Sequence, residues 1–281
     1  MKWFQALLQN TPQHKYAINA ALLGDASESA WTNLGYWQAQ NHAYPHACGT
    51  LAQRLADAID LNSKDRVLDL GCGQGASLHL WKSHYQVAHI EAVDMQPACV
   101  DKIIHSMPFI HNAICGSFLN LSDYDFEFKF DAVLCIDAAY HSDLNLFLKS
   151  VKTVLNSKAR IGFHYLVLTE KYVALNSFEK LKLSALLKSA DIQLKHLNSY
   201  VETENIIRSF GFEKIQIENL SRPVLQGFAD YIQQSSQQQA QKKLQGQWSL
   251  DRFKIEMTAK LCQKLYADGL VDYVQICAVN A

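Results

Sequence analysis

Three glycines at positions 71, 73 and 75 alternate with other residues in VLDLGCGQGAS, directly after a run of apolar, strand-forming residues. A chain that leaves a strand through glycines and enters a helix presents a row of backbone N–H groups. Such a loop suits a nucleotide-like ligand. No GKS or GKT follows the glycines, which argues against a P-loop for a nucleoside triphosphate.

Two acids narrow the choice of ligand. Asp94 ends the next apolar run, in IEAVDMQ, where a carboxylate accepts hydrogen bonds from both hydroxyls of a ribose. NAD and S-adenosylmethionine both carry that ribose, and with Ala76 the glycines also match the dinucleotide pattern G-x-G-x-x-A. Asp69 favours S-adenosylmethionine, because its carboxylate repels a pyrophosphate and attracts a sulfonium and an ammonium.

The elements that must position these residues follow from an alternation of β-rich runs with helical patterns. This alternation predicts an α/β fold: a doubly wound, mostly parallel seven-stranded sheet with helices on both faces. A helix is expected over 47–59, before the first strand. The predicted strands span residues 66–71, 88–95, 111–116, 130–137, 160–168, 213–219 and 272–279.

Two helical insertions, 170–200 and 222–269, interrupt the alternation. Extra helices beside the carboxyl edge of a parallel sheet usually cover the ligand crevice, so we expect helical caps there. The second insertion includes a glutamine-rich tract that predicts a solvated helix or loop. The predicted division is a helical lid at 1–60, a cofactor-binding core at 61–169, a cap at 170–200, a core helix and strand at 201–221, a second cap at 222–269 and a final core strand at 270–281.

Composition bounds the function further. The formal net charge of −1 provides no strong global attraction for nucleic acid, and no apolar run is long enough to span a membrane. The seven cysteines are scattered without a CxxC pair, which argues against a zinc site and a disulfide framework. The first residues do not read as a secretory signal. We therefore expect a cytoplasmic protein without a bound metal.

From about residue 34 to its end, the chain resembles the class I S-adenosylmethionine-dependent methyltransferases. VLDLGCGQG is similar to the first motif of that family, and VDMQP to the second. AICGSFLNL resembles the adenine-contacting segment, and FDAVLCIDAAYH the fourth motif. SFGFEKIQIENLS and DYVQICAVN resemble the late helix-to-strand junction and the final, antiparallel strand. NLGYW is similar to the small-molecule branch, which methylates tocopherols, quinones, amines and macrolide sugars.

The resemblance implies S-adenosyl-L-methionine as cofactor and a set of residues that bind it. Tyr36 lies in the lid, where an aromatic face can contact the sulfonium. Ser117 replaces the acid that the family usually carries opposite the adenine amino group. The predicted cofactor-binding residues are Tyr36, Asp69, Gly71, Gly73, Asp94, Met95, Ser117, Phe118 and Asp137.

Two histidines are candidate catalytic residues. Methyl transfer needs the acceptor atom, the methyl carbon and the sulfur in line, and a hydroxyl acceptor also benefits from a base. His141 follows the fourth strand and is the first candidate, with capping of the next helix as its alternative role. His164, on the fifth strand, is the second, with a structural role as its alternative. The prediction is methylation of a small molecule, with O-methylation preferred over N- or C-methylation.

The aromatic share of 11% and the capped crevice point to an apolar or aromatic acceptor. An NAD-dependent oxidoreductase and a non-catalytic adenosyl-ligand-binding protein on the same scaffold stay open as alternatives. A nucleic-acid methyltransferase is disfavoured, because DAAYH stands where enzymes acting on base amino groups show Asn or Asp followed by Pro-Pro and an aromatic residue.

Overall fold

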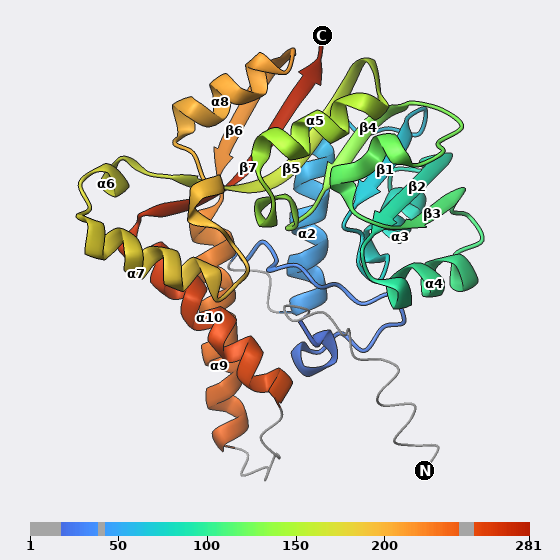
Figure 1. The fold of residues 1–281 in the computed structure, drawn as a ribbon. Helices are drawn as coiled ribbons and strands as arrows, with labels where there is room; N and C mark the ends of the chain where they lie inside the picture. Colours follow the sequence, from blue (N-terminus) through green and yellow to red (C-terminus); the bar gives the residue numbers. More distant parts are fainter. Residues whose placement is uncertain (1–17, 39–42, 242–249) are drawn as a thin grey trace.

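The computed structural model describes residues 18–38, 43–241 and 250–281. The predicted α/β fold is confirmed: seven strands form one sheet in the order β3-β2-β1-β4-β5-β7-β6 (Figure 1). Strand β7 runs antiparallel to both of its neighbours, and the strands from β3 to β5 are parallel. Parts of the predicted lid and of the second cap, at 1–17, 39–42 and 242–249, lie outside the described residues.

The strand bounds agree with the predicted ones within a few residues, except at the start of β5. This strand begins at Leu155, which pairs with Phe130 before a bulge shifts the register to Ala132 and Arg160. The strands are β1 Arg66–Leu70, β2 His89–Asp94, β3 Asn112–Cys115, β4 Phe130–Cys135, β5 Leu155–Leu168, β6 Phe212–Asn219 and β7 Val271–Asn280.

The helices fill the connections between these strands. The long helices are α2 Tyr44–Ala58, α3 Ala76–Ser83, α4 Pro97–Ser106, α5 Leu144–Val154, α7 Ser177–Lys188, α8 Tyr200–Ser209, α9 Gly227–Gln241 and α10 Leu250–Asp268. Shorter turns are η1 Ala20–Leu23, η2 Phe118–Asp123, η3 Ala139–His141, α6 Glu170–Val173, η4 Leu194–His196 and the π-helical η5 Arg222–Gln226.

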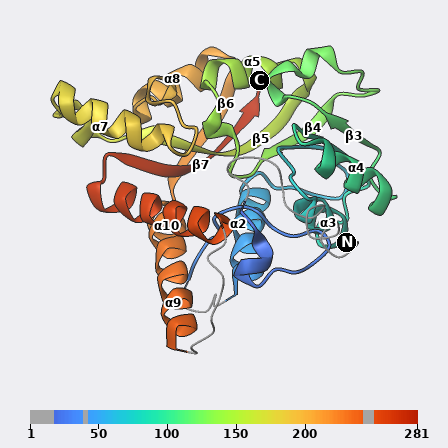
Figure 2. The same ribbon diagram turned by 60° about the horizontal axis from the view of Figure 1, so that its bottom comes forward.

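Helices cover both faces of the sheet. Helices α2 and α3 contact each other on one face, and α5 lies with η2 and α8 on the other (Figure 2). Strands covered on both faces are mostly apolar, as in the fully buried VLDL of β1, where Asp69 is the polar exception. Apolar side chains from both sides therefore form one core.

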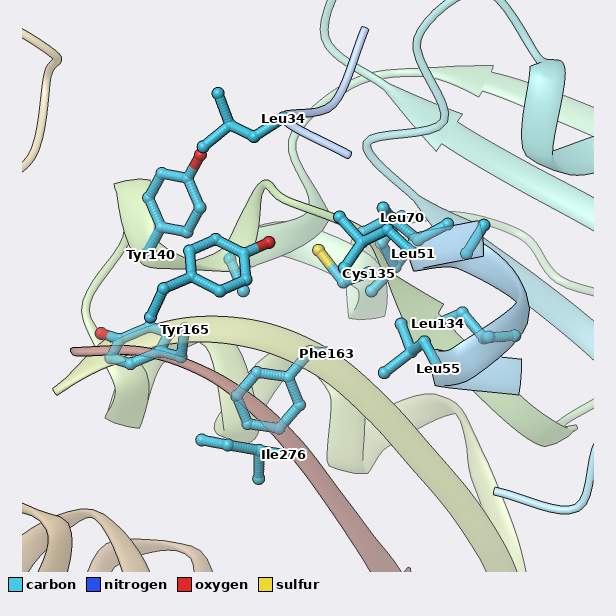
Figure 3. Close-up of a cluster of buried hydrophobic side chains, with 14 of the residues drawn as sticks. Leu34, Leu51, Leu55, Leu70, Leu134, Cys135, Tyr140, Phe163, Tyr165 and Ile276 are labelled. Carbon is cyan, nitrogen blue, oxygen red and sulfur yellow. The ribbon is translucent and has the colours of Figure 1, made fainter. Parts of the chain in front are cut away.

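The central part of this core joins α2 to the middle strands. Leu51 and Leu55 of α2 lie close to Leu134 of β4 (Figure 3). Figure 3 also shows Leu34, from the segment before α2, beside Tyr140 at the carboxyl end of β4. Residues 18–38, called the N-terminal segment below, thus pack against the core rather than along its surface.

Helices α9 and α10 pack against each other and extend away from the sheet (Figure 1). The segment before α2 runs between this helix pair and the half of the sheet that carries α3 and α4. Within the described ranges, no helix has both the length and the apolar character that a membrane crossing requires.

Candidate functional site

The three glycines form a tight turn between β1 and α3. Gly71, Gly73 and Gly75 all have positive φ values, of 70°, 53° and 86°, which side chains rarely permit. A Cβ at Gly71 would lie 2.9 Å from the Cβ of Ala138, and one at Gly75 would lie 2.4 Å from the Cε of Met107. The positive φ values of the turn and the close neighbours of Gly71 and Gly75 therefore favour glycine at these positions.

Asp94, at the end of β2, is hydrogen-bonded to this turn. Its two carboxylate oxygens accept from the N–H of Gly73 and the N–H of Gln96, each at 2.8 Å. The side chain is buried, with 7% of its surface exposed. A carboxylate offers about four lone-pair sites. Asp94 therefore holds the glycine turn in shape, with its carboxylate at the end of β2 beside the turn.

A pocket lies beside the turn, and Asp69 forms part of its wall. The indole Nε1–H of Trp81 donates to the Asp69 carboxylate at 2.6 Å. Burial raises the pKa of Asp69 to about 6, against hydrogen bonds from Ser77 and Trp81 that lower it. Near neutral pH this wall carries a negative charge, which suits a cationic group of a ligand.

The opposite wall of the pocket comes from the N-terminal segment, through Trp31, Thr32 and Asn33. Sequence reasoning placed Tyr36 there instead. The Tyr36 ring faces the guanidinium of Arg54, 4.5 Å from the ring centroid, and Tyr36 does not line this pocket. The sequence feature that could have indicated these pocket residues is Asn33, since Asn favours turns. Its side chain accepts from the Gly35 N–H and bends the chain at the pocket.

Asp137 joins four parts of the chain at the carboxyl end of β4. Its φ of 53° is unusual for a residue with a side chain, and its N–H donates to Nδ1 of His164 on β5. Its carboxylate accepts from the hydroxyls of Tyr140 and Tyr273 and from the N–H of Leu34, at 2.8–2.9 Å. Burial raises the pKa of Asp137 to about 6 and the pKa of both phenols well above their usual value.

His141 lies in η3, next to this cluster. The centroids of its ring and the Tyr140 ring are 4.5 Å apart, and its Nδ1 lies 3.4 Å from the carbonyl oxygen of Asp191. The alternative role of His141 as the cap of α5 is wrong. Asp143 caps that helix, because its carboxylate accepts from the N–H groups of Asn145 and Leu146.

His164 is fully buried behind Asp137. Burial lowers its pKa to about 3, so the ring is neutral at physiological pH. The side chain of Gln275, the paired residue of His164 on β7, lies beside the ring and opposes this shift. The ring holds the Asp137 backbone in place, which corresponds to the structural alternative for this residue.

The predicted adenine contacts lie at the ends of β2 and β3. Met95 follows Asp94 and is 59% exposed. Ser117 caps η2 by accepting from the N–H of Leu119 at 3.2 Å, so its hydroxyl already has a partner. The Phe118 ring meets the Phe147 ring edge-on at 5.7 Å. Met95 is therefore the most exposed of these three predicted adenine contacts.

The strand order, the reversed β7, the glycine turn after β1 and the acid at the end of β2 define the Rossmann-like methyltransferase fold. A family model described as "Methyltransferase domain" matches residues 67–158. Residues 67–158 therefore match a methyltransferase domain, and the sheet around them has the fold of the class I S-adenosylmethionine-dependent methyltransferases. The four cofactor-binding motifs read from the sequence fall within or directly beside the matched residues.

Two curated relatives and one solved structure illustrate the likeness. The chain is 38% identical over 74 residues to erythromycin 3''-O-methyltransferase of Saccharopolyspora erythraea, which is 26% of this chain and 24% of the relative. It is 24% identical over 210 residues to 24-methylenesterol C-methyltransferase 2 of Arabidopsis thaliana, which is 72% of this chain and 57% of the relative. The chain thus spans about a quarter of the first relative and just over half of the second.

The geranyl diphosphate C-methyltransferase of Streptomyces coelicolor has the same fold, with a TM-score of 0.69 at 16% identity. That likeness covers 98% of this chain and 96% of the other. Among the residues that the structure describes here, no three His, Cys, Asp or Glu side chains are grouped as a metal ion would need.

Proposed function

We propose that the protein transfers the methyl group of S-adenosylmethionine to a small-molecule acceptor. The observation that carries the proposal is the pocket between the glycine turn and residues 31–33, with the buried carboxylate of Asp69 in its wall. The match to the methyltransferase family supports it, and so do the activities after which the two relatives are named, which concern a macrolide and a sterol.

In this proposal six of the nine predicted cofactor residues have separate tasks. Asp69 attracts the cationic amino-acid end, Asp94 accepts from the ribose hydroxyls, and Met95 covers the adenine. Ser117 and Phe118 complete the adenine side. The cofactor supplies an electrophilic methyl group, and the N-terminal segment excludes water from it. Asp137 keeps that segment in place through its hydrogen bond to Leu34.

We propose an apolar or aromatic acceptor that binds under the caps at 170–200 and 222–269. Tyr140 and Tyr273 support this assignment, because both rings lie beside Asp137, with their centroids 6.2 Å apart. A hydroxyl group is the proposed methyl acceptor. Its support is His141, which contacts Tyr140 at the edge of this cluster, because histidine is the side chain most often used as a general base.

Isothermal titration of the full chain with S-adenosylhomocysteine tests the proposal, with NADH titrated beside it. We expect saturable binding of S-adenosylhomocysteine alone. Binding of NADH without S-adenosylhomocysteine would replace the proposal with an oxidoreductase. Binding of S-adenosylhomocysteine without turnover of any acceptor, across a panel of phenols, sterols, amino sugars and amines, would leave a non-catalytic binding protein.

The choice of oxygen as methyl acceptor is tested separately, by His141→Ala. We expect S-adenosylhomocysteine affinity to stay unchanged while turnover of a hydroxyl acceptor falls by about 10²–10⁴-fold. The control is His105→Ala, at an exposed position on α4. Equal turnover in the His141 variant would remove the proposed base and the preference for oxygen with it.

A further inference from the structure

The N-terminal segment touches the cofactor pocket at one end and the second cap at the other. Trp37 donates its backbone N–H to the carbonyl oxygen of Pro223 at 2.9 Å, in the turn that leads into α9. Its indole stacks on the ring of Tyr231 in α9, with centroids 4.2 Å apart and an interplanar angle of 23°. The hydroxyl of Tyr231 donates to the carbonyl oxygen of Leu23 at 2.9 Å. Helix α9 thus holds this segment at two separate points.

From Trp37 the contacts continue to the candidate site. The indole Nε1–H donates to the carbonyl oxygen of Leu34 at 2.8 Å, and the N–H of Leu34 donates to Asp137 at 2.8 Å. One or two residues earlier, Thr32 and Asn33 line the cofactor pocket. The Oγ1 of Thr32 is 3.1 Å from where a Cβ of Gly73 would stand. An unbroken series of packed groups therefore runs from α9 to the glycine turn.

Gly227, the first residue of α9, shows how tightly this series is packed. A Cβ at this position would lie 2.4 Å from the Cβ of Trp37 and 2.9 Å from its Cγ. The backbone of Gly227 has φ −60° and ψ −44°, which any residue adopts in a helix. The contact with Trp37, and not the backbone conformation, is what excludes a side chain there.

We propose that Gly227 and Trp37 are positioning residues, through which helix α9 sets residues 31–37 over the cofactor pocket. The inference rests on the proposed function, since it concerns the same cofactor site. A side chain at Gly227 would push Trp37 aside. Close-packed groups transmit such a shift, so it would move Leu34 and the pocket wall formed by Thr32 and Asn33. An acceptor that fixes α9 then tightens cofactor binding, and by reciprocity the cofactor tightens acceptor binding.

The first test is Gly227→Ala in the full chain, with the dissociation constant for S-adenosylhomocysteine measured by calorimetry. Alanine favours the helix more than glycine does, so α9 itself is not weakened. We expect the dissociation constant to rise at least about tenfold in a variant that still folds, with a lower urea midpoint of unfolding because the added methyl group overpacks this contact. The matched control is Gly49→Ala in α2, where the added Cβ would lie 3.8 Å from Trp31 and the affinity should not change.

The second test is Trp37→Phe, which keeps a ring against Tyr231 and removes the N–H that bonds to Leu34. Loss of one such hydrogen bond should weaken S-adenosylhomocysteine binding by about threefold to tenfold. If Gly227→Ala does not fold, this variant decides. Wild-type affinity in a folded Gly227→Ala variant, or in Trp37→Phe, overturns the coupling and leaves the proposed function intact. Failure of the wild-type protein to bind S-adenosylhomocysteine overturns both.

Discussion

At the scale of single residues, two buried carboxyl groups determine how the site responds to pH. Burial raises the pKa of Asp69 and of Asp137 to about 6. A folded-state pKa above the unfolded value means that the folded chain binds more protons between about pH 4 and 6. These two groups therefore lower the free energy of unfolding as the pH rises through that interval, and their effect is constant above it.

Ligand binding should show the opposite trend over the same interval. The ionised form of Asp69 attracts an ammonium group, so S-adenosylhomocysteine should bind about tenfold more tightly at pH 7 than at pH 5. Calorimetry across this range measures the effect. Asp69→Asn keeps an acceptor for the Trp81 N–H but cannot ionise. A pH dependence that is undiminished in this variant would assign the titration to another group.

Asp94 gives a second prediction at this scale. Asp94→Ala removes the proposed ribose contact and also the acceptors for the N–H groups of Gly73 and Gln96. We expect S-adenosylhomocysteine binding to weaken by at least about 1.5–3 kcal/mol, as for hydrogen bonds to charged groups. Asp101→Ala, at an exposed position on α4, is the control. Unchanged affinity in the Asp94 variant would show that the ribose lies elsewhere.

At the scale of elements, the candidate site depends on the meeting of β4, β5 and β7. Asp137 follows β4, His164 lies on β5, and Tyr273 lies on β7, two residues before Gln275, which pairs with His164. Strand β7 runs antiparallel between β5 and β6, so its first residues lie near the carboxyl end of β4. The hydroxyl of Tyr273, near the start of β7, therefore reaches Asp137.

His164→Ala tests the role of this junction. The variant leaves a buried space and an unpaired N–H at Asp137, so the free energy of unfolding should fall by about 2–4 kcal/mol in urea titrations. His105→Ala should leave it unchanged. A His164 variant with full stability and lost turnover would instead support the catalytic role predicted for His164 from the sequence.

At the scale of the whole molecule, the N-terminal segment links the sheet to helices α9 and α10 (Figure 1). A ligand that fills the pocket between this segment and the glycine turn stabilises the folded state by mass action. At about 100 times its dissociation constant, S-adenosylhomocysteine should add about 2.7 kcal/mol. Differential scanning fluorimetry should then show a Tm higher by several degrees, at about 2–4 °C per kcal/mol for a chain of this size. The same concentration of NADH should have no effect, and a Tm that responded equally to both ligands would contradict the proposed selectivity.

Most of the fold could be predicted from local sequence patterns, because each pattern depends on residues close together in the chain. Period-two and apolar runs marked the seven strands, and the glycines and Asp94 marked the turn and the next strand end. The start of β5 was missed, because the pairing of Leu155 with Phe130 and the bulge after it involve residues on two strands. The sequence alone could not show that pairing.

The sequence by itself determined the sheet and its glycine turn and favoured an adenosyl ligand, since strand period, turn residues and the charge of Asp69 and Asp94 are local properties. Only the tertiary structure decided which side chains share a space. It placed Arg54 against Tyr36, lined the pocket with Thr32 and Asn33, buried His164 behind Asp137 and gave the cap of α5 to Asp143. Residues 34, 137 and 273 meet because chain folding brings together groups that are more than a hundred residues apart, and no local pattern records such a contact.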